Sequence, residues 1–193
     1  KVRGYSKIIF LLIFSDGDFK GYIITGKLVA EGEFIYKAYL NTWPPLFALF
    51  CLPLSFITDQ TQPILYFLWL VATVLVFIWS IKFIVKTTIG YSFSFFPKKG
   101  HLALNHSFIA IPILLIIKFL LDNLMNVQIN VFFFAICLLI IKYYQNEKAW
   151  LVGILLALTI SLKVYTIFFL AYFLYKRAFK VVAWSSFFLL IFN

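Results

Sequence analysis

The chain has 193 residues, of which 64% are hydrophobic, 21% aromatic and only 12% charged, and its mean hydropathy is +1.00. A soluble domain of this length could not bury so much apolar surface, so the composition excludes an ordinary soluble globular fold and indicates lipid as the main solvent. The formal net charge of +10 does not indicate a nucleic-acid-binding protein, because the bases stand in small groups between apolar runs. That distribution is typical of Lys and Arg held at the cytoplasmic face of a membrane.

The first long polar stretch, residues 15–45, reads SDGDFKGYIITGKLVAEGEFIYKAYLNTWPP. It follows Ile8–Phe14, an apolar run too short to cross a membrane alone, which we expect to be the outer end of a truncated first helix. A short helix-like pattern within it leads to the rigid corner Trp43-Pro44-Pro45. We expect this segment to form an external loop that carries the active site.

The apolar runs that follow predict an all-α fold, a polytopic transmembrane helical bundle that forms one integral-membrane domain over residues 1–193. Leu46–Thr58 is short and contains Pro53, which favours a re-entrant or interfacial hairpin. If it crosses fully instead, one basic connection must lie outside. The other expected spans are Ile64–Val85, Leu102–Leu121, Val131–Tyr144, Ala149–Leu162, Val164–Tyr175 and the incomplete Val181–Phe192.

Lys- and Arg-bearing connections predict the orientation of the bundle. They read KTTIGYSFSFFPKKGH, KYYQNEK and YKRAFK, and we place all three in the cytoplasm. The outer side then receives the 15–45 segment, the NVQIN sequence at 126–130 and Lys163. Cys51 and Cys137 lie inside apolar runs without a CxxC partner and predict neither a disulfide framework nor a metal site. With no initiator Met, the sequence is expected to be the N-terminal part of a longer protein.

Three parts of the chain together resemble a family. The run Asp18-Phe19…Tyr22…Gly32…Tyr36, closing on PPLFAL, is similar to the first external loop of GT-C glycosyltransferases. The 126–130 segment resembles an NGQxN motif of glycosyltransferase family 87, the polyprenyl-phosphate-mannose-dependent mannosyltransferase group. The region from Gly153 to Lys163, with the later Lys176-Arg177, resembles that family's GxxLALaaxxK…RR region. Val127 departs from the motif, which has Gly at that position.

The resemblance implies a hexosyltransferase of the cell envelope. Such an enzyme moves a hexose, mannose in this group, from a polyprenyl-phosphate donor to a hydroxyl of a glycan or glycolipid acceptor. The expected location is the plasma membrane with the active site on the external face, and membrane lipid is the expected surrounding. No cofactor is required by this chemistry, a divalent metal stays open, and no nucleic-acid partner is expected. The alternative is a non-catalytic transporter of a lipid or small solute, which needs polar residues along a continuous path.

An inverting transfer needs a carboxylate that takes the acceptor proton and a group that holds the leaving phosphate. Asp18 matches the family's Asp-Phe pair and is the expected base, with Asp16 in reserve. The residues alone favour the simpler interpretation that both acids are solvated loop residues marking the end of a helix, and the resemblance reverses this for Asp18 but not for Asp16. Lys163 between two apolar runs either reaches the outer headgroups or, as the resemblance implies, neutralises the donor phosphate.

Polar and aromatic side chains complete the candidate site. The amides of Asn126, Gln128 and Asn130 either bind the donor sugar and phosphate or cap a helix start. The rings of Tyr22, Tyr36 and Trp43 either stack on a sugar face of the acceptor or belong to an interfacial aromatic belt.

Overall fold

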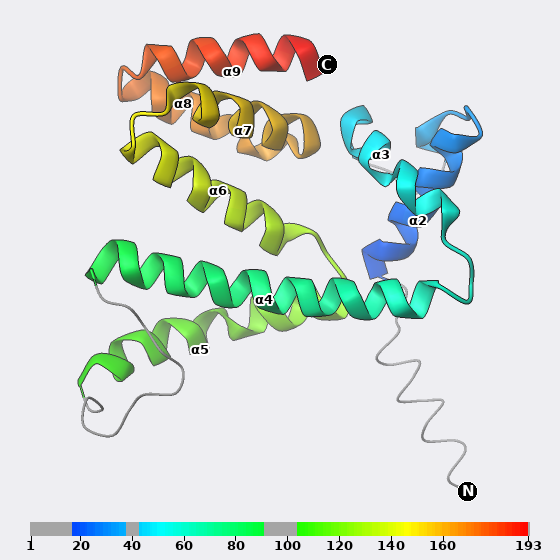
Figure 1. Cartoon of the computed structure of the whole chain (residues 1–193), viewed down its shortest axis with the longest axis horizontal. Helices are drawn as coiled ribbons and strands as arrows, with labels where there is room; N and C mark the ends of the chain where they lie inside the picture. The colour runs from blue at the N-terminus through cyan, green and yellow to red at the C-terminus, as the bar shows by residue number, and fades with distance from the viewer. Residues whose placement is uncertain (1–16, 38–42, 91–103, 193) are drawn as a thin grey trace, which may run out of the picture.

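The computed structural model describes residues 17–37, 43–90 and 104–192, which are helical with no β-strand among them (Figure 1). Asp16 and the Ile8–Phe14 run lie outside the described residues. The elements are α2 (Gly17–Ala30), η1 (Ile35–Lys37), α3 (Pro45–Cys51), η2 (Leu52–Phe56), α4 (Gln62–Ile89), α5 (Leu104–Met125), α6 (Asn130–Gln145), α7 (Ala149–Leu162), η3 (Val164–Ile167), α8 (Phe168–Tyr175) and α9 (Phe179–Phe192).

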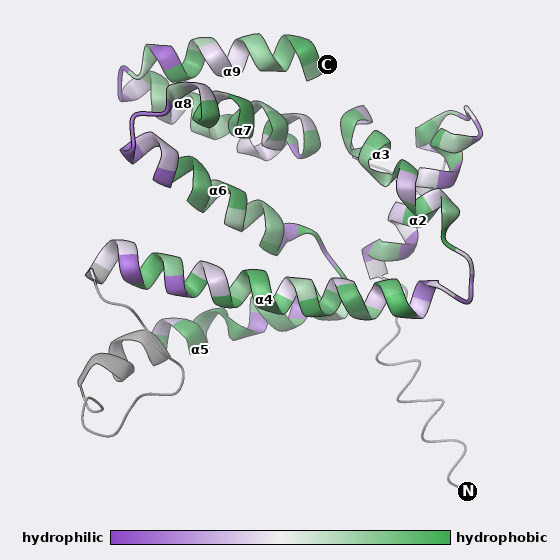
Figure 2. Ribbon diagram, in the orientation of Figure 1, coloured by the Kyte–Doolittle hydropathy of each residue, from purple (hydrophilic) through white to green (hydrophobic). Residues whose placement is uncertain are grey.

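Successive helices from α4 to α9 run in alternating directions (Figure 1). Helices α4 and α5 lie side by side, α6 crosses from them toward α7, and α9 packs on α7. Helices α2 and α3 pack against each other beside the start of α4. The α5–α6 turn, the end of α7 and the start of α2 therefore share one end of the molecule. The α6–α7 and α8–α9 turns lie at the opposite end, and Figure 2 shows hydrophilic residues concentrated at these turns.

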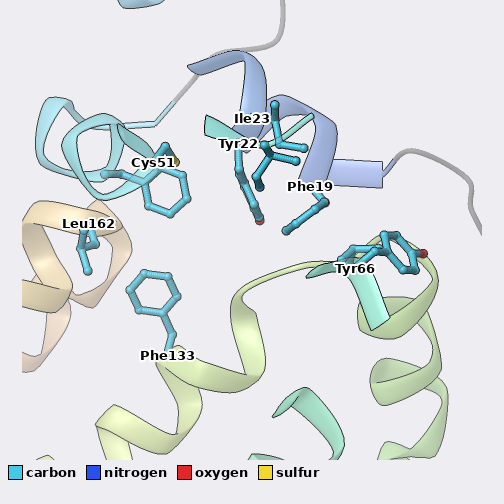
Figure 3. Close-up of a cluster of buried hydrophobic side chains, with 10 residues drawn as sticks. Phe19, Tyr22, Ile23, Cys51, Tyr66, Phe133 and Leu162 are labelled. Carbon is cyan, nitrogen blue, oxygen red and sulfur yellow. The ribbon is translucent and has the colours of Figure 1, made fainter. Parts of the chain in front are cut away.

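The main buried cluster joins helices that are far apart in the sequence. Figure 3 shows Phe19 of α2 beside Tyr66 of α4, with Tyr22, Phe133 of α6 and Leu162 of α7 in the same cluster. The two aromatic residues of α2 are each 2% exposed. Edge-to-face contacts hold them, with Phe19 and Tyr66 at 6.0 Å between ring centroids. This packing fixes α2 onto the other helices.

The segment expected to be an external loop contains a regular helix. Phe19, Tyr22, Ile23 and Gly26 recur at helical spacing and are the buried face of α2. The helix-like pattern expected in this segment is therefore present, and its external position stays a prediction. Gly26 permits close packing, because a Cβ there would lie 2.2 Å from the backbone oxygen of Cys51.

One helix of the described residues is long and apolar enough to cross a membrane, the stretch of α4 from Gln62 to Thr88. The expected spans at 131–144, 149–162 and 181–192 are present as helices of 14 to 16 residues. At 1.5 Å per residue these helices are roughly 21–24 Å long, short of the ~30 Å hydrocarbon layer. The all-α fold is confirmed, and the full polytopic bundle stays a prediction.

The contact between α7 and α9 generates the first prediction. A Cβ at Gly153 would lie 2.4 Å from the Cβ of Trp184. Gly153→Ala should destabilise the chain by about 1–3 kcal/mol through overpacking. On helix propensity alone the same change would stabilise it by about 1 kcal/mol. Thermal unfolding of the detergent-solubilised protein decides the sign, and a raised melting temperature would contradict the close packing.

Candidate functional site

A polar cluster brings a carboxylate and an amine together at the end of the molecule where α2, α6 and α7 meet. The Lys163 ammonium donates to Asn130 Oδ1 at 2.5 Å, and Asn130 Nδ2 donates to Gln128 Oε1 at 2.7 Å. The Gln128 side chain also faces the Asp18 carboxylate and acts to lower its pKa. Four of the residues singled out from the sequence are thus in one connected cluster.

Asp18 is positioned by its backbone. Its N–H donates to the carbonyl oxygen of Asn126 at 2.8 Å. The preceding residue, Gly17, has φ +35° and lies so close that a Cβ would be 2.4 Å from that same oxygen. Only glycine fits this approach, because any side chain would collide with backbone that cannot move aside. The start of α2 is therefore held directly against the α5–α6 turn.

The α5–α6 turn presents Gln128 toward Asp18. Val127 is completely buried and has φ +49°, an unfavourable conformation for a β-branched residue. The Asn126 side chain donates to the Asp122 carbonyl at 3.0 Å, so it caps the end of α5. In this structure Asn126 contributes its backbone oxygen to the site, whereas its amide, expected to bind the donor, is engaged elsewhere.

Lys163 lies where the chain reverses between α7 and η3. Its backbone is extended, with φ −154° and ψ 105°, and its carbonyl accepts a hydrogen bond from Thr166 Oγ1 at 3.0 Å. The ammonium also lies 5.7 Å from the ring centroid of Phe133 and 5.3 Å from that of Tyr165. Cation–π attraction and the Asn130 bond hold the amine inside the cluster.

The two ionisable groups influence each other. Burial raises the pKa of the Asp18 carboxyl, while the Lys163 charge and the Gln128 hydrogen bond act to lower it. Burial lowers the pKa of the Lys163 ammonium, and the Asp18 carboxylate acts in the opposite direction. Each group therefore favours the charged form of the other in a partly desolvated setting.

The three candidate aromatics are not equivalent. Tyr22 is 2% exposed, and its ring packs against Trp43 and Phe47 at 4.9 and 5.2 Å between centroids. Its expected contact with a sugar is not available in this structure, because neighbouring aromatic side chains cover the Tyr22 ring. Trp43 is half-buried above Gly21. Tyr36 is 43% exposed, packs edge-on against Phe34, and has an accessible ring.

Asn123 is a site residue that the sequence interpretation missed. Its amide nitrogen lies 3.4 Å from Gln128 Oε1, whereas its oxygen is buried and has no hydrogen-bond partner. A cavity of about 400 Å³ is lined by Asp122, Asn123, Gln128 and Asn130 at its polar part and by apolar side chains elsewhere, including Phe77 and Phe119. In the sequence, Asn123 could have been found as a polar amide one helical turn before the NVQIN segment. An unpaired buried oxygen beside a cavity points to a ligand donor.

The described residues contain no group of three or more His, Cys, Asp or Glu side chains that could hold a metal ion. Their fold and site define a helical protein with one helix long and apolar enough to cross a membrane and a polar cluster that brings a carboxylate and an amine together.

The chain belongs to glycosyltransferase family 87, since the model of that family matches residues 41–193. The resemblance inferred from the motifs is confirmed. Comparison with curated proteins gives no match, and comparison with solved structures gives none either. The matched region includes the 126–130 turn and Lys163 but begins after Asp18, so the role of Asp18 rests on its geometry.

The strained turn generates a prediction about stability. Val127→Ala keeps the left-handed backbone, which costs about 1–2 kcal/mol for a residue with a Cβ. Val127→Gly loses the side-chain contacts that the Ala variant loses and those of the Cβ as well. It also removes the cost of holding a residue with a Cβ in the left-handed conformation. The Gly variant should therefore have a free energy of unfolding about 1 kcal/mol higher than that of the Ala variant. Its melting temperature should be higher accordingly. An Ala variant as stable as the Gly variant would show that the left-handed backbone at position 127 is not strained.

A third prediction concerns the pKa of the Asp18 carboxyl. Replacing Lys163 with Gln removes the charge that lowers the pKa of Asp18, so this pKa should rise further. Lys163→Arg keeps the charge and should leave it closer to the starting value. Infrared titration of the carboxyl band, assigned with an Asp18→Asn sample, measures both. Equal titrations in the Gln and Arg variants would show that the amine does not act on the carboxylate.

Proposed function

We propose that this glycosyltransferase moves a hexose, mannose by family resemblance, from a polyprenyl-phosphate donor to a hydroxyl of a glycan or glycolipid acceptor. The observation that carries the proposal is the polar cluster in which Lys163 and Asn130 and then Asn130 and Gln128 are hydrogen-bonded, with Lys163 and Gln128 both acting on the Asp18 carboxylate. It supplies a base and a phosphate-neutralising group within one cluster. We assign the enzyme to the GT-C type of membrane hexosyltransferases.

Asp18 acts as the general base in a single inverting displacement. The acceptor oxygen attacks the anomeric carbon, and its proton passes to the Asp18 carboxylate. The bond between the anomeric carbon and the phosphate oxygen breaks, and the electron pair leaves with the polyprenyl phosphate. A carboxylate whose pKa is raised by burial is a stronger base than a fully solvated one, which suits this role.

Lys163 and the amides receive the leaving phosphate. The ammonium offsets the charge that develops on the phosphate, and Gln128 and Asn130 orient the ammonium and donate to sugar or phosphate oxygens. The cavity beside them supports this assignment, since its amide-lined part suits the polar head and its apolar walls suit the polyprenyl chain. The unpaired Asn123 oxygen is a further acceptor for a sugar hydroxyl.

The acceptor approaches from the side of α2 and η1, where Tyr36 offers an exposed ring and Trp43 a partly covered one. We place this end of the molecule at the external face of the plasma membrane. The Lys- and Arg-bearing α6–α7 and α8–α9 turns lie at the opposite end, which supports a cytoplasmic position for them.

Replacing Asp18 with Asn removes the base and keeps its shape. Transfer from a polyprenyl-phosphate-linked hexose should fall by about 10²- to 10⁴-fold, because general-base catalysis contributes roughly that factor. Radiolabelled donor and purified protein in liposomes measure the rate.

Asp59→Asn is the matched control, an exposed acid just before α4 at the same end of the molecule, and it should keep normal activity. An active Asp18→Asn enzyme would remove Asp18 from the base role. Solute uptake into the liposomes in the absence of any lipid-linked sugar would instead favour the transporter alternative.

A further inference from the structure

A second polar hollow lies at the end of the molecule opposite Lys163. It occupies about 790 Å³ between the α6–α7 and α8–α9 turns. Its charged lining consists of Lys176, Arg177 and Lys180 with one acid, Glu147. Three cations and one carboxylate leave a surplus of two positive charges around a single concave space. The proposed transfer reaction uses none of these residues.

Backbone groups add to the positive character of this hollow. Helix α7 begins at Ala149 and helix α9 at Phe179, and both first residues line it. The first N–H groups of a helix have no partner within the helix, and the aligned peptide dipoles place partial positive charge there. The Ala149 N–H donates to the Glu147 carbonyl at 3.1 Å, so α7 offers the N–H groups that follow it. Two helix starts and three basic side chains therefore face one volume, which favours an anion with several acceptor oxygens, such as phosphate.

The surroundings of the hollow favour a lipid over a soluble anion. Tyr175 is 82% exposed and Phe179 is 64% exposed, and they flank the basic residues in sequence. Exposed aromatic residues beside Lys and Arg at helix ends are typical of the headgroup region of a membrane. The α8 helix and the part of α9 that follows Lys180 are mostly apolar. A ligand with a phosphate head and acyl chains would meet charge in the hollow and apolar surface along these helices.

We propose that this hollow binds the phosphate headgroup of an anionic phospholipid of the cytoplasmic leaflet. Lys176, Arg177 and Lys180 hold the phosphate, and the helix starts of α7 and α9 donate to its oxygens. The bound lipid ties the α6–α7 turn to the α8–α9 turn and so fixes α7, the helix that ends at Lys163. The site is separate from the Asp18 cluster, so it holds or fails independently of the proposed transfer reaction.

The test compares two variants that each lose two positive charges at the same end of the protein. Lys176→Gln combined with Lys180→Gln removes two side chains that line the hollow. Lys86→Gln combined with Lys142→Gln removes two exposed lysines from the last turns of α4 and α6, outside it. Native mass spectrometry of the full chain in detergent, titrated with phosphatidylglycerol or with phosphatidylcholine, measures retained lipid.

The unmodified chain should retain phosphatidylglycerol in preference to phosphatidylcholine. The variant within the hollow should bind phosphatidylglycerol at least about tenfold more weakly, because each basic residue near an anionic lipid contributes about 1 kcal/mol of binding free energy. The control variant should lose much less affinity, because its two lysines lie outside the hollow. Equal losses in both variants would show a general surface attraction and overturn the site. Displacement of the lipid by millimolar inorganic phosphate would assign the hollow to a soluble anion and overturn the lipid assignment. Unchanged melting temperatures in both variants confirm that folding is intact.

Discussion

The hydrogen bond from the Asp18 backbone to the Asn126 carbonyl is the contact on which the candidate site depends. It requires glycine at position 17, since a side chain there would collide with the Asn126 backbone. The bond brings the beginning of α2 against a turn more than a hundred residues later. Without it, the carboxylate and the amides would belong to separate parts of the molecule. The aromatic cluster of Phe19, Tyr22 and Tyr66 then keeps α2 in that position.

The charged groups of the polar cluster fix the direction of each amide between them. Lys163 can only donate, so Asn130 turns its oxygen to the amine and its nitrogen to Gln128 Oε1, which leaves the Gln128 nitrogen for the side of the Asp18 carboxylate, an acceptor when ionised. Such aligned bonds strengthen one another in a partly desolvated region. The cluster is therefore organised before a substrate enters, as a transfer that stabilises developing phosphate charge requires.

Polar chemistry is divided between the two ends of an apolar helical body. The Asp18–Lys163 cluster occupies one end, and the basic hollow at Lys176 and Lys180 occupies the other. Helix α7 connects the ends, because it begins beside the basic hollow and ends at Lys163. Its packing against α9 through Gly153 makes it a rigid element between two sites of different chemistry.

The sequence alone determined the helical fold, the family and most of the polar residues of the cluster. Apolar runs of helical length place α4, α6, α7 and α9 within a few residues, and the 126–130 segment and Lys163 stand out because polar groups are costly among apolar ones. It could not place side chains whose environment depends on contacts between distant helices. Tyr22 was expected to meet a sugar and is buried, and Asn123 was overlooked although its oxygen lies unpaired beside a cavity. Only the tertiary structure decided that Asp18 and Lys163 share a cluster, because that depends on a backbone approach at Gly17 and a left-handed turn at Val127, which local pattern does not encode.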